Sequence, residues 1–230
     1  MKLKAAIFDL DDTLYDYQPL NKIAMDAVCD KVCQKIKITR EYFFEIFNAS
    51  CRGIKSRLGE VAASHNRVLY FQTILDSLNV YSPALCLELY DLYWGTFLEQ
   101  IELRCGVLEC FKLLREQGIK IAICTDLTAH IQHRKILKLC LNSYIDVLVT
   151  SEEAGIEKPN KAIFALCLDK LGVNAAEAFF VGDSLERDIE GAKNAGIFPV
   201  HVTSEYAIRP DMVCITNFVQ MYDWLDDNIT

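Results

Sequence analysis

The chain has 230 residues, enough for one large domain or for a core domain with a smaller second unit. Hydrophobic residues make up 52% of it and charged residues 24%, a composition that excludes a disordered chain. The formal net charge is −8 and no basic tract is present, which argues against general binding to nucleic acid. No apolar run is long enough to span a bilayer, so we expect no membrane partner. Asp9 and Asp11 interrupt the apolar stretch near the N-terminus, so we expect no secretory signal either.

The ten cysteines are the one unusual feature of the composition. They form neither a CxxC pair nor the spacing of a zinc site, and most of them lie among apolar neighbours. A disulfide framework is the alternative to reduced thiols that behave as small apolar side chains. The apolar surroundings favour reduced thiols, and therefore a cytoplasmic location.

The chain begins with an apolar run at residues 3–8 that predicts a short buried strand. From residue 17 to about residue 99, apolar residues recur at helical spacing. After Gly106, short apolar runs alternate with helical stretches. The expected strands of this second part are 119–124, 145–150, 178–181 and 198–202. The expected helices are 107–117, 128–141, 160–171 and 186–195, before a last short strand and helix at 213–227.

Strands that alternate with helices indicate an α/β fold with a parallel sheet covered on both faces. The all-helical block interrupts this alternation directly after the first strand. We therefore interpret it as an insertion in the loop at the carboxyl end of that strand. The predicted domains are a core of residues 1–16 and 100–230 and a helical domain of residues 17–99.

Four polar stretches break the apolar pattern, each at the carboxyl end of a predicted strand, where open α/β sheets bind ligands. The first is Asp9-Leu10-Asp11-Asp12-Thr13. In an extended chain Asp9 and Asp11 face the same way. Two adjacent carboxylates suit a divalent cation, and they also suit a nucleophile paired with an acid/base group. A merely polar turn would not need two acids on one side.

The second and third stretches contain candidate anion-binding groups. Thr125 follows the strand expected at 119–124, and its hydroxyl with nearby backbone N–H groups could hold an anion. Thr-Asp before a helix is also a common N-cap. Lys158 is expected at the amino end of a helix, where the helix dipole disfavours a cation. An anionic partner would explain this lysine, and exposure to solvent is the alternative.

The fourth stretch carries two further acids. Asp183 comes directly after the strand expected at 178–181, and Asp188 lies near the start of the next helix. An acid in a first helical turn is ordinary complementation of the helix dipole, so Asp188 has a structural explanation as well. Asp183 has no such explanation, which makes it the stronger candidate for a functional acid.

Together these stretches resemble the haloacid dehalogenase superfamily, and the resemblance covers most of the chain. Phe8-Asp9-Leu10-Asp11-Asp12-Thr13-Leu14 is similar to the first motif of the family, DxDx[TV]. Thr125 falls at the second motif, Lys158 at the third, and Gly182-Asp183 with Asp188 at the fourth. The resemblance implies a Rossmann-like three-layer α/β/α core, and it implies that the helical block is a C1 cap.

The resemblance also implies a role for each motif residue. Asp9 would be the nucleophile that attacks phosphorus and forms an aspartyl-phosphate. Asp11 would protonate the leaving oxygen and then activate the hydrolytic water. Thr125 and Lys158 would bind the phosphoryl oxygens. These roles fit phosphoryl transfer, which depends mainly on positioning and on neutralising spread negative charge.

The cofactor that the resemblance implies is Mg²⁺. Asp9, the backbone carbonyl of Asp11, and Asp183 would hold it, with Asp188 close by or acting through water. Asp126 departs from the family pattern, because many members carry asparagine after the second-motif Ser/Thr. An extra acid near a phosphate is unfavourable unless it points away or pairs with a cation.

In capped members the cap usually contributes substrate specificity. The segment 51–67 is rich in basic residues, and a solvated helix face would explain that. Otherwise its side chains could grip a second polar or anionic group on the leaving alcohol. The candidates are Arg52, Arg57, His65 and Arg67. The pair His130 and His133 lacks a third ligand, and we expect both on the surface.

The favoured function is a Mg²⁺-dependent phosphatase that hydrolyses a small phosphorylated metabolite, such as a sugar phosphate or nucleotide. A sugar phosphomutase uses the same DxD motif and is the first alternative. A 2-haloacid dehalogenase needs neither the second aspartate nor Mg²⁺, so Asp11 argues against it. A non-catalytic binding protein would not need the intact acid and lysine set. The sequence determines neither the substrate nor the oligomeric state.

Overall fold

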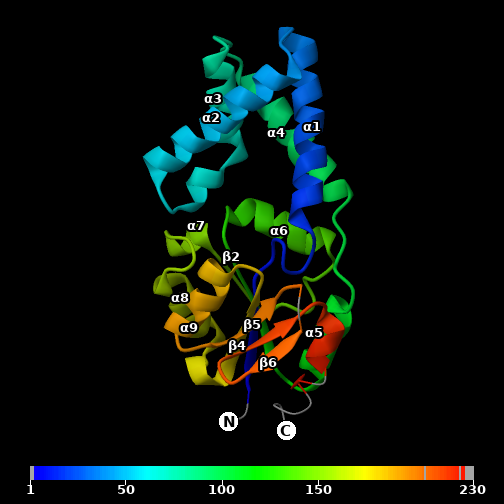
Figure 1. The fold of residues 1–230 in the computed structure, drawn as a ribbon, viewed down its shortest axis with the longest axis vertical. Helices are drawn as coiled ribbons and strands as arrows, with labels where there is room; N and C mark the ends of the chain where they lie inside the picture. Colours follow the sequence, from blue (N-terminus) through cyan, green and yellow to red (C-terminus); the bar gives the residue numbers. More distant parts are fainter. Residues whose placement is uncertain (1–2, 205, 223, 226–230) are drawn as a thin grey trace. The chain divides into compact units, whose positions relative to one another are not determined.

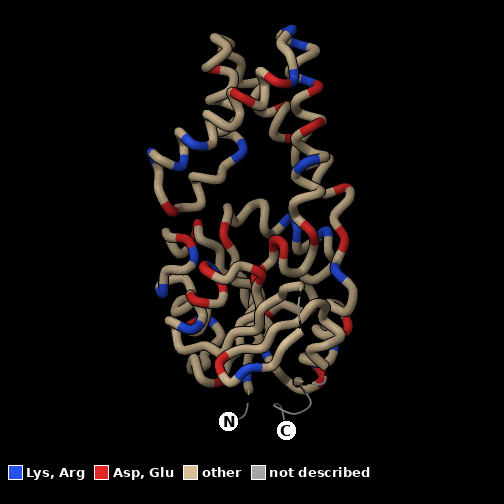
Figure 2. The backbone as a smooth tube through the Cα atoms, in the orientation of Figure 1, with Lys and Arg blue, Asp and Glu red and all other residues tan. Residues whose placement is uncertain are grey.

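The computed structural model describes residues 3–204, 206–222 and 224–225. The chain divides into two compact units. One is formed by the segment up to Asp16 together with the segment from Glu102 onward, and the other is Tyr17–Ile101. Figure 2 shows Lys and Arg interspersed with Asp and Glu along the backbone of both units. No helix among the described residues has both the length and the apolar character to cross a membrane.

The first unit is built on a sheet whose strands are ordered β3-β2-β1-β4-β5-β7-β6 (Figure 1). Neighbours from β3 to β7 pair in parallel, and β6 runs antiparallel to β7. The parallel sheet confirms the predicted α/β class. The strands are β1 (Ala5–Phe8), β2 (Lys120–Thr125), β3 (Val147–Thr150), β4 (Ala178–Gly182), β5 (Phe198–Val202), β6 (Ala207–Arg209) and β7 (Met212–Ile215).

Strand β1 lies between β2 and β4, and this position explains its unbroken apolar sequence. A central parallel strand is covered on both faces, so all four of its side chains are buried. Phe8 is in register with Ile123 on one side and with Val181 on the other. The backbone N–H of Asp9 then donates to the carbonyl of Val181 at 2.9 Å. The polar residues that follow these three strands therefore emerge at one edge of the sheet.

Helices cover both faces of the sheet (Figure 1). On one face, Ile163 and Phe164 of α8 pack in a buried cluster with Ile7 of β1. On the other face, the ring of Phe111 from α5 lies 4.8 Å from the ring of Phe8. The described helices of this unit are α5 (Val107–Glu116), α6 (Ala129–Lys138), α7 (Ser151–Ala154), α8 (Lys161–Leu171) and α9 (Gly191–Asn194), with the short 3-10 turns η2 (Ala175–Glu177) and η4 (Phe218–Gln220) and the π-helical segment η3 (Leu185–Glu190).

The second unit contains only helical elements among its described residues. They are α1 (Tyr17–Ile36), α2 (Arg40–Leu58), η1 (Ala62–His65), α3 (Arg67–Ser77) and α4 (Pro83–Glu99). The hydroxyls of Thr39 and Ser82 accept backbone N–H groups at the starts of α2 and α4. The rings of Tyr93, Trp94 and Phe97 pack against one another in its core.

Two expectations about side chains agree with the structure. All ten cysteines lie among the described residues as free thiols, and Cys110, Cys124 and Cys167 are buried. His130 and His133 are both exposed on α6. The helix expected at the end of 213–227 lies partly outside the described residues. Of the other helices expected after Gly106, the last differs from its prediction. The stretch expected as a helix over 186–195 is a π-helical segment, η3, followed by the short α9.

Candidate active site

Asp9 follows β1 directly, and its side chain is almost completely buried at the sheet edge. The Nζ of Lys158 donates to its Oδ1 at 2.6 Å. The hydroxyl of Thr13 lies 3.2 Å from Oδ2 of Asp9 and 3.1 Å from Oδ1 of Asp183. Burial raises the pKa of Asp9 well above its usual value; Lys158 opposes this shift, and Asp188 and Asp183 add to it. Asp9 is therefore a carboxylate whose charge needs compensation.

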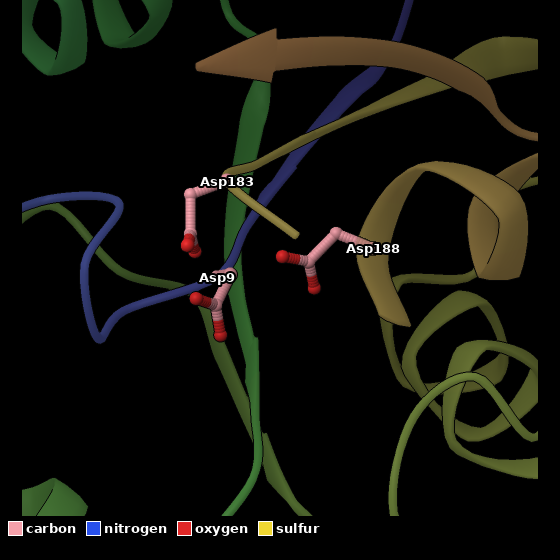
Figure 3. A group of neighbouring side chains, drawn as sticks. All are labelled: Asp9, Asp183 and Asp188. Carbon is pink, nitrogen blue, oxygen red and sulfur yellow. The ribbon is translucent and has the colours of Figure 1, made fainter. Parts of the chain in front are cut away.

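Three acids converge at this point, as Figure 3 shows for Asp9, Asp183 and Asp188. One carboxylate oxygen from each lies within 4.8 Å of the others. Asp183 comes directly after β4, the neighbour of β1, and Asp188 is carried by η3. Burial and the charge of Asp188 raise the pKa of Asp183. The structure thus brings together three of the acids that the sequence selected.

Gly182 makes the close approach of Asp188 possible. A Cβ at Gly182 would lie 2.5 Å from both Cγ and Oδ2 of Asp188, far inside van der Waals contact. The same carboxylate accepts the backbone N–H of Ser184 at 3.0 Å, which fixes its orientation. Residue 182 must therefore lack a side chain for the acid cluster to form.

The donor set of this cluster fits a hard divalent cation. Carboxylate oxygens are the protein ligands that Mg²⁺ prefers. The Nζ of Lys158 contacts Asp9 at 2.6 Å and Asp188 at 2.7 Å, but it is one ammonium facing three carboxylates. Negative charge is left over in a largely buried place, where an uncompensated charge costs several kcal/mol. A divalent cation would offset that charge.

Lys158 is buried two residues before Asn160, the N-cap of α8. This position agrees with the predicted place near the amino end of a helix. Burial alone would lower the pKa of Lys158, but the charges of Asp188 and Asp9 raise it well above its usual value. The ammonium group therefore stays protonated, and the alternative of a solvent-facing lysine is wrong.

Asp126 pairs with a cation, as expected of an extra acid that lies near a phosphate site. Its Oδ2 lies 3.1 Å from Nη1 of Arg187, and its Oδ1 accepts the backbone N–H of Lys158 at 3.1 Å. Burial raises the pKa of Asp126, and Lys158 and Arg187 oppose that shift. Asp126 thus braces the loop that carries Lys158.

Thr125 and Asp11 make contacts to α6 rather than to the acid cluster. Thr125 is buried at the end of β2, and its Oγ1 accepts Nε2 of Gln132 at 2.8 Å. The carboxylate of Asp11 accepts the Nζ of Lys135 at 2.6 and 2.8 Å and the hydroxyl of Tyr15. Nε2 of Gln132 lies 3.3 Å from Oδ2 of Asp11. Two candidates that lie far apart in the sequence therefore share one helix as their support.

Two residues that contact the candidate site, Gln132 and Lys135, were not predicted from the sequence; both are completely buried on α6. Both lie on the same side of the helix as the buried residues Ile131 and Ile136. A glutamine and a lysine at the buried positions of an amphipathic helix were the signal available in the sequence. The sequence alone does not show which face of this helix packs on the sheet, so this signal could not be recognised without the structure.

In the helical unit, Arg67 is buried, whereas Arg52 and Arg57 are exposed on α2 and His65 is half-buried. The guanidinium carbon of Arg67 lies over the rings of Tyr70 and Tyr93, 5.1 and 5.0 Å from their centroids. No carboxylate among the described residues forms an ion pair with it. Its contacts are Tyr17 Oη at 2.6 Å, His65 O at 3.2 Å, Tyr93 Oη at 3.3 Å and Asn21 Oδ1 at 3.4 Å.

Comparison with known proteins shows the family of this chain. The model of the haloacid dehalogenase-like hydrolase family matches residues 6–202. Ribulose-1,5-bisphosphate 5-phosphatase of Halopiger xanaduensis is 42% identical over 196 residues, which cover 84% of this chain and 82% of that protein. Glyceraldehyde 3-phosphate phosphatase of Methanopyrus kandleri is 31% identical over 204 residues, which cover 87% of this chain and 84% of that protein.

A solved structure supports the fold. The crystal structure of a HAD phosphatase from Thermococcus onnurineus matches with a TM-score of 0.76 and 23% sequence identity, over 99% of this chain and all of that one. These matches confirm the family that the four motifs resemble. The chain therefore belongs to the haloacid dehalogenase-like hydrolase family and is a phosphoric monoester hydrolase.

Proposed function

We propose that this chain is a Mg²⁺-dependent phosphatase that hydrolyses a small phosphorylated metabolite through an aspartyl-phosphate on Asp9. The observation that carries the proposal is the buried contact of 2.6 Å between Asp9 and Lys158 beside two further acids. In this proposal residues 1–16 and 100–230 are the catalytic core domain and residues 17–99 are a C1 cap. The ten free thiols fit a reducing cytoplasm.

In the first step of the proposed reaction, a carboxylate oxygen of Asp9 attacks the phosphorus of the substrate. The bond between phosphorus and the ester oxygen breaks as Asp11 donates a proton to the leaving oxygen. The Thr125 hydroxyl and the Lys158 ammonium bind the phosphoryl oxygens. Lys158 is suited to this role because its pKa is raised and it stays charged while buried.

In the second step a water molecule attacks the phosphorus of the aspartyl-phosphate. Asp11, now deprotonated, accepts a proton from that water, and the products are inorganic phosphate and free Asp9. Asp9, Asp183 and Asp188, with the backbone carbonyl of Asp11, would hold the metal ion. When bound, Mg²⁺ supplies positive charge that offsets the repulsion between a carboxylate nucleophile and a phosphate dianion.

We favour a sugar phosphate over a nucleotide as the substrate. The two similar phosphatases carry in their names ribulose-1,5-bisphosphate and glyceraldehyde 3-phosphate. Of the four cap candidates, Arg67 is the one that we propose contacts the substrate, through an anionic or polar group of the leaving alcohol. It is buried without a carboxylate partner in the described part of the chain, whereas Arg52 and Arg57 are exposed. A buried charge of this kind favours an anionic ligand.

The test is a panel of phosphorylated sugars and nucleotides, assayed for inorganic phosphate with and without Mg²⁺. We expect release that requires Mg²⁺ and that is lost in Asp9→Asn. Transfer within a bisphosphorylated sugar without net release would indicate the phosphomutase instead. Halide release from a 2-haloacid without metal would indicate the dehalogenase. No phosphate release from any ester by the wild-type protein would overturn the proposal.

A further inference from the structure

The acid/base candidate Asp11 is held by helix α6. The Nζ of Lys135 lies 2.6 Å from Oδ1 and 2.8 Å from Oδ2 of this carboxylate. The hydroxyl of Tyr15 donates to Oδ1 as well. Rotation of the carboxylate about its Cβ–Cγ bond would break at least one of these contacts. The orientation of the Asp11 oxygens is therefore fixed from the helix side.

Stability alone does not explain the pair of Lys135 and Asp11. The side chain of Lys135 is completely buried, and burying an ammonium group costs several kcal/mol before pairing offsets the cost. Replacing such a pair by packed apolar side chains is often neutral or stabilising. The Asp11 side chain is 21% exposed, so it remains accessible to a reacting group while Lys135 is not. The buried Lys135 is therefore suited to holding the carboxylate in place, and the partly exposed Asp11 is suited to reacting.

Gln132, one helical turn before Lys135, holds a second group of the candidate site, the hydroxyl of Thr125. Its Nε2 lies 2.8 Å from Oγ1 of Thr125 and 2.7 Å from the carbonyl oxygen of Asp126. An amide nitrogen has two protons, and these two short contacts use them. Since Nε2 donates to Oγ1, the Thr125 hydroxyl donates its own proton elsewhere, and the acceptor that it meets in the structure is the carbonyl oxygen of Asp126 at the long distance of 3.4 Å. An acceptor at a shorter distance could replace this weak contact. A phosphoryl oxygen is such an acceptor.

We propose that Lys135 is a positioning residue, which orients the carboxyl group of Asp11 for the two proton transfers of the proposed reaction. The protonated group gives its proton to the leaving oxygen in the first step, and the carboxylate accepts a proton from water in the second. Gln132 positions the Thr125 hydroxyl toward the phosphoryl group in the same way. This inference rests on the proposed function, in which Asp11 is the acid and Thr125 a phosphate ligand. It adds two residues of α6 that act through the groups contacting the substrate.

The experiment compares two substrates whose leaving groups differ in their need for an acid. An alkyl phosphate must have its leaving oxygen protonated, whereas p-nitrophenyl phosphate needs little help. The ratio of kcat/KM for the two esters therefore measures proton donation by Asp11 in the first step. The variants are Lys135→Met, Asp11→Asn, the double variant, and Lys135→Arg, which keeps a cation. Lys138→Met is the matched control, because Lys138 is exposed on the same helix.

We expect Lys135→Met to lower kcat/KM for the alkyl ester by about 100-fold, and for the aryl ester by less than about 10-fold. In the Asp11→Asn background, Lys135→Met should change neither value further, because the carboxyl group that Lys135 orients is absent. Lys135→Arg should recover part of the loss, and Lys138→Met should behave as wild type. Circular dichroism and a denaturant melt of each variant show that it is folded.

Equal losses for the two esters in Lys135→Met would overturn the inference, as would an additive loss in the double variant. Wild-type rates in Lys135→Met would also overturn it, while leaving the proposed function intact. A wild-type protein without phosphate release would instead overturn the proposed function, and the inference with it.

Discussion

Lys158 and Asp9 form a buried ion pair, with Nζ 2.6 Å from Oδ1, although 149 residues separate them in the chain. The same Nζ lies 2.7 Å from Asp188. One lysine thus joins the residue after β1 to the π-helical segment after β4. Lys158 can contact Asp9 and Asp188 together because the strand order places β1 beside β4. The topology of the sheet therefore assembles the candidate site.

The first prediction concerns this pair. Lys158→Met leaves Asp9 and Asp188 buried without their cation, so metal-free protein should lose about 3 kcal/mol of unfolding free energy. Phosphatase activity should be lost as well. Urea denaturation measures the first effect, and addition of Mg²⁺ should reduce it. Lys161→Met at an exposed position of α8 is the control. A Lys158→Met variant as stable as this control would contradict the account.

The second prediction concerns Gly182. In Gly182→Ala the new methyl group must displace the Asp188 carboxylate, so Mg²⁺ should bind at least about 10-fold more weakly. The measurement is the rise in melting temperature during a Mg²⁺ titration. Gly95→Ala is the matched control, since a Cβ there meets no atom within 4 Å and the site is helical. That control should keep the wild-type response, and an identical response in Gly182→Ala would refute the proposed metal site.

The third prediction concerns Arg67. If it binds an anionic group of the leaving alcohol, Arg67→Met should lower kcat/KM for sugar bisphosphates by about 10- to 100-fold. Activity on p-nitrophenyl phosphate, which lacks such a group, should change by less than about 3-fold. Arg67→Lys should retain an intermediate preference for the bisphosphates. Arg52→Met is the control because Arg52 is exposed. A parallel loss on both substrates would show that Arg67 only supports the helical unit.

The fourth prediction concerns pH and the Cys110 thiol. Burial raises its pKa from 9.0 to about 12. The folded protein therefore keeps a proton that the unfolded chain releases above about pH 9, so this thiol lowers the unfolding free energy as pH rises from 9 toward 12. At pH 8 iodoacetamide should modify the exposed Cys105 and Cys140 and spare Cys110 until urea is added. Peptide mass spectrometry measures the extent of modification of each cysteine. Equal modification of Cys110 and Cys105 in folded protein would contradict this prediction.

Much of the fold could be predicted from the sequence because buried parallel strands are apolar throughout. The runs at 3–8, 119–124, 145–150, 178–181 and 198–202 each contain or overlap a strand of the sheet. Strand β6 was not predicted, since Ala207–Arg209 is a short and mostly exposed edge strand without an apolar run. The π-helical form of η3 was not predicted either, because its sequence has the spacing of an ordinary helix.

Some residues of the candidate site could also be predicted from the sequence, and others could not. Asp9 and Asp183 come directly after strands and Thr125 ends one, and the topology of a parallel sheet brings strand ends together. Lys135 lies on a helix, where only packing decides which side is buried. The distinction between Arg67 and Arg57 also depends on packing, because tyrosines of α1, α3 and α4 enclose only the first. Contacts between distant helices leave no local pattern in the sequence.

The central claim is that Asp9 carries the phosphoryl group during turnover, and peptide mass spectrometry of acid-quenched enzyme tests it most directly. Asp11→Asn should be mixed with p-nitrophenyl phosphate and Mg²⁺, because this ester needs no acid to react while hydrolysis of the intermediate needs a base. We predict a phosphoryl group on the peptide that contains Asp9, absent in Asp9→Asn and absent without substrate. Phosphate release by an enzyme whose Asp9 peptide stays unmodified, with turnover retained in Asp9→Asn, would contradict the account.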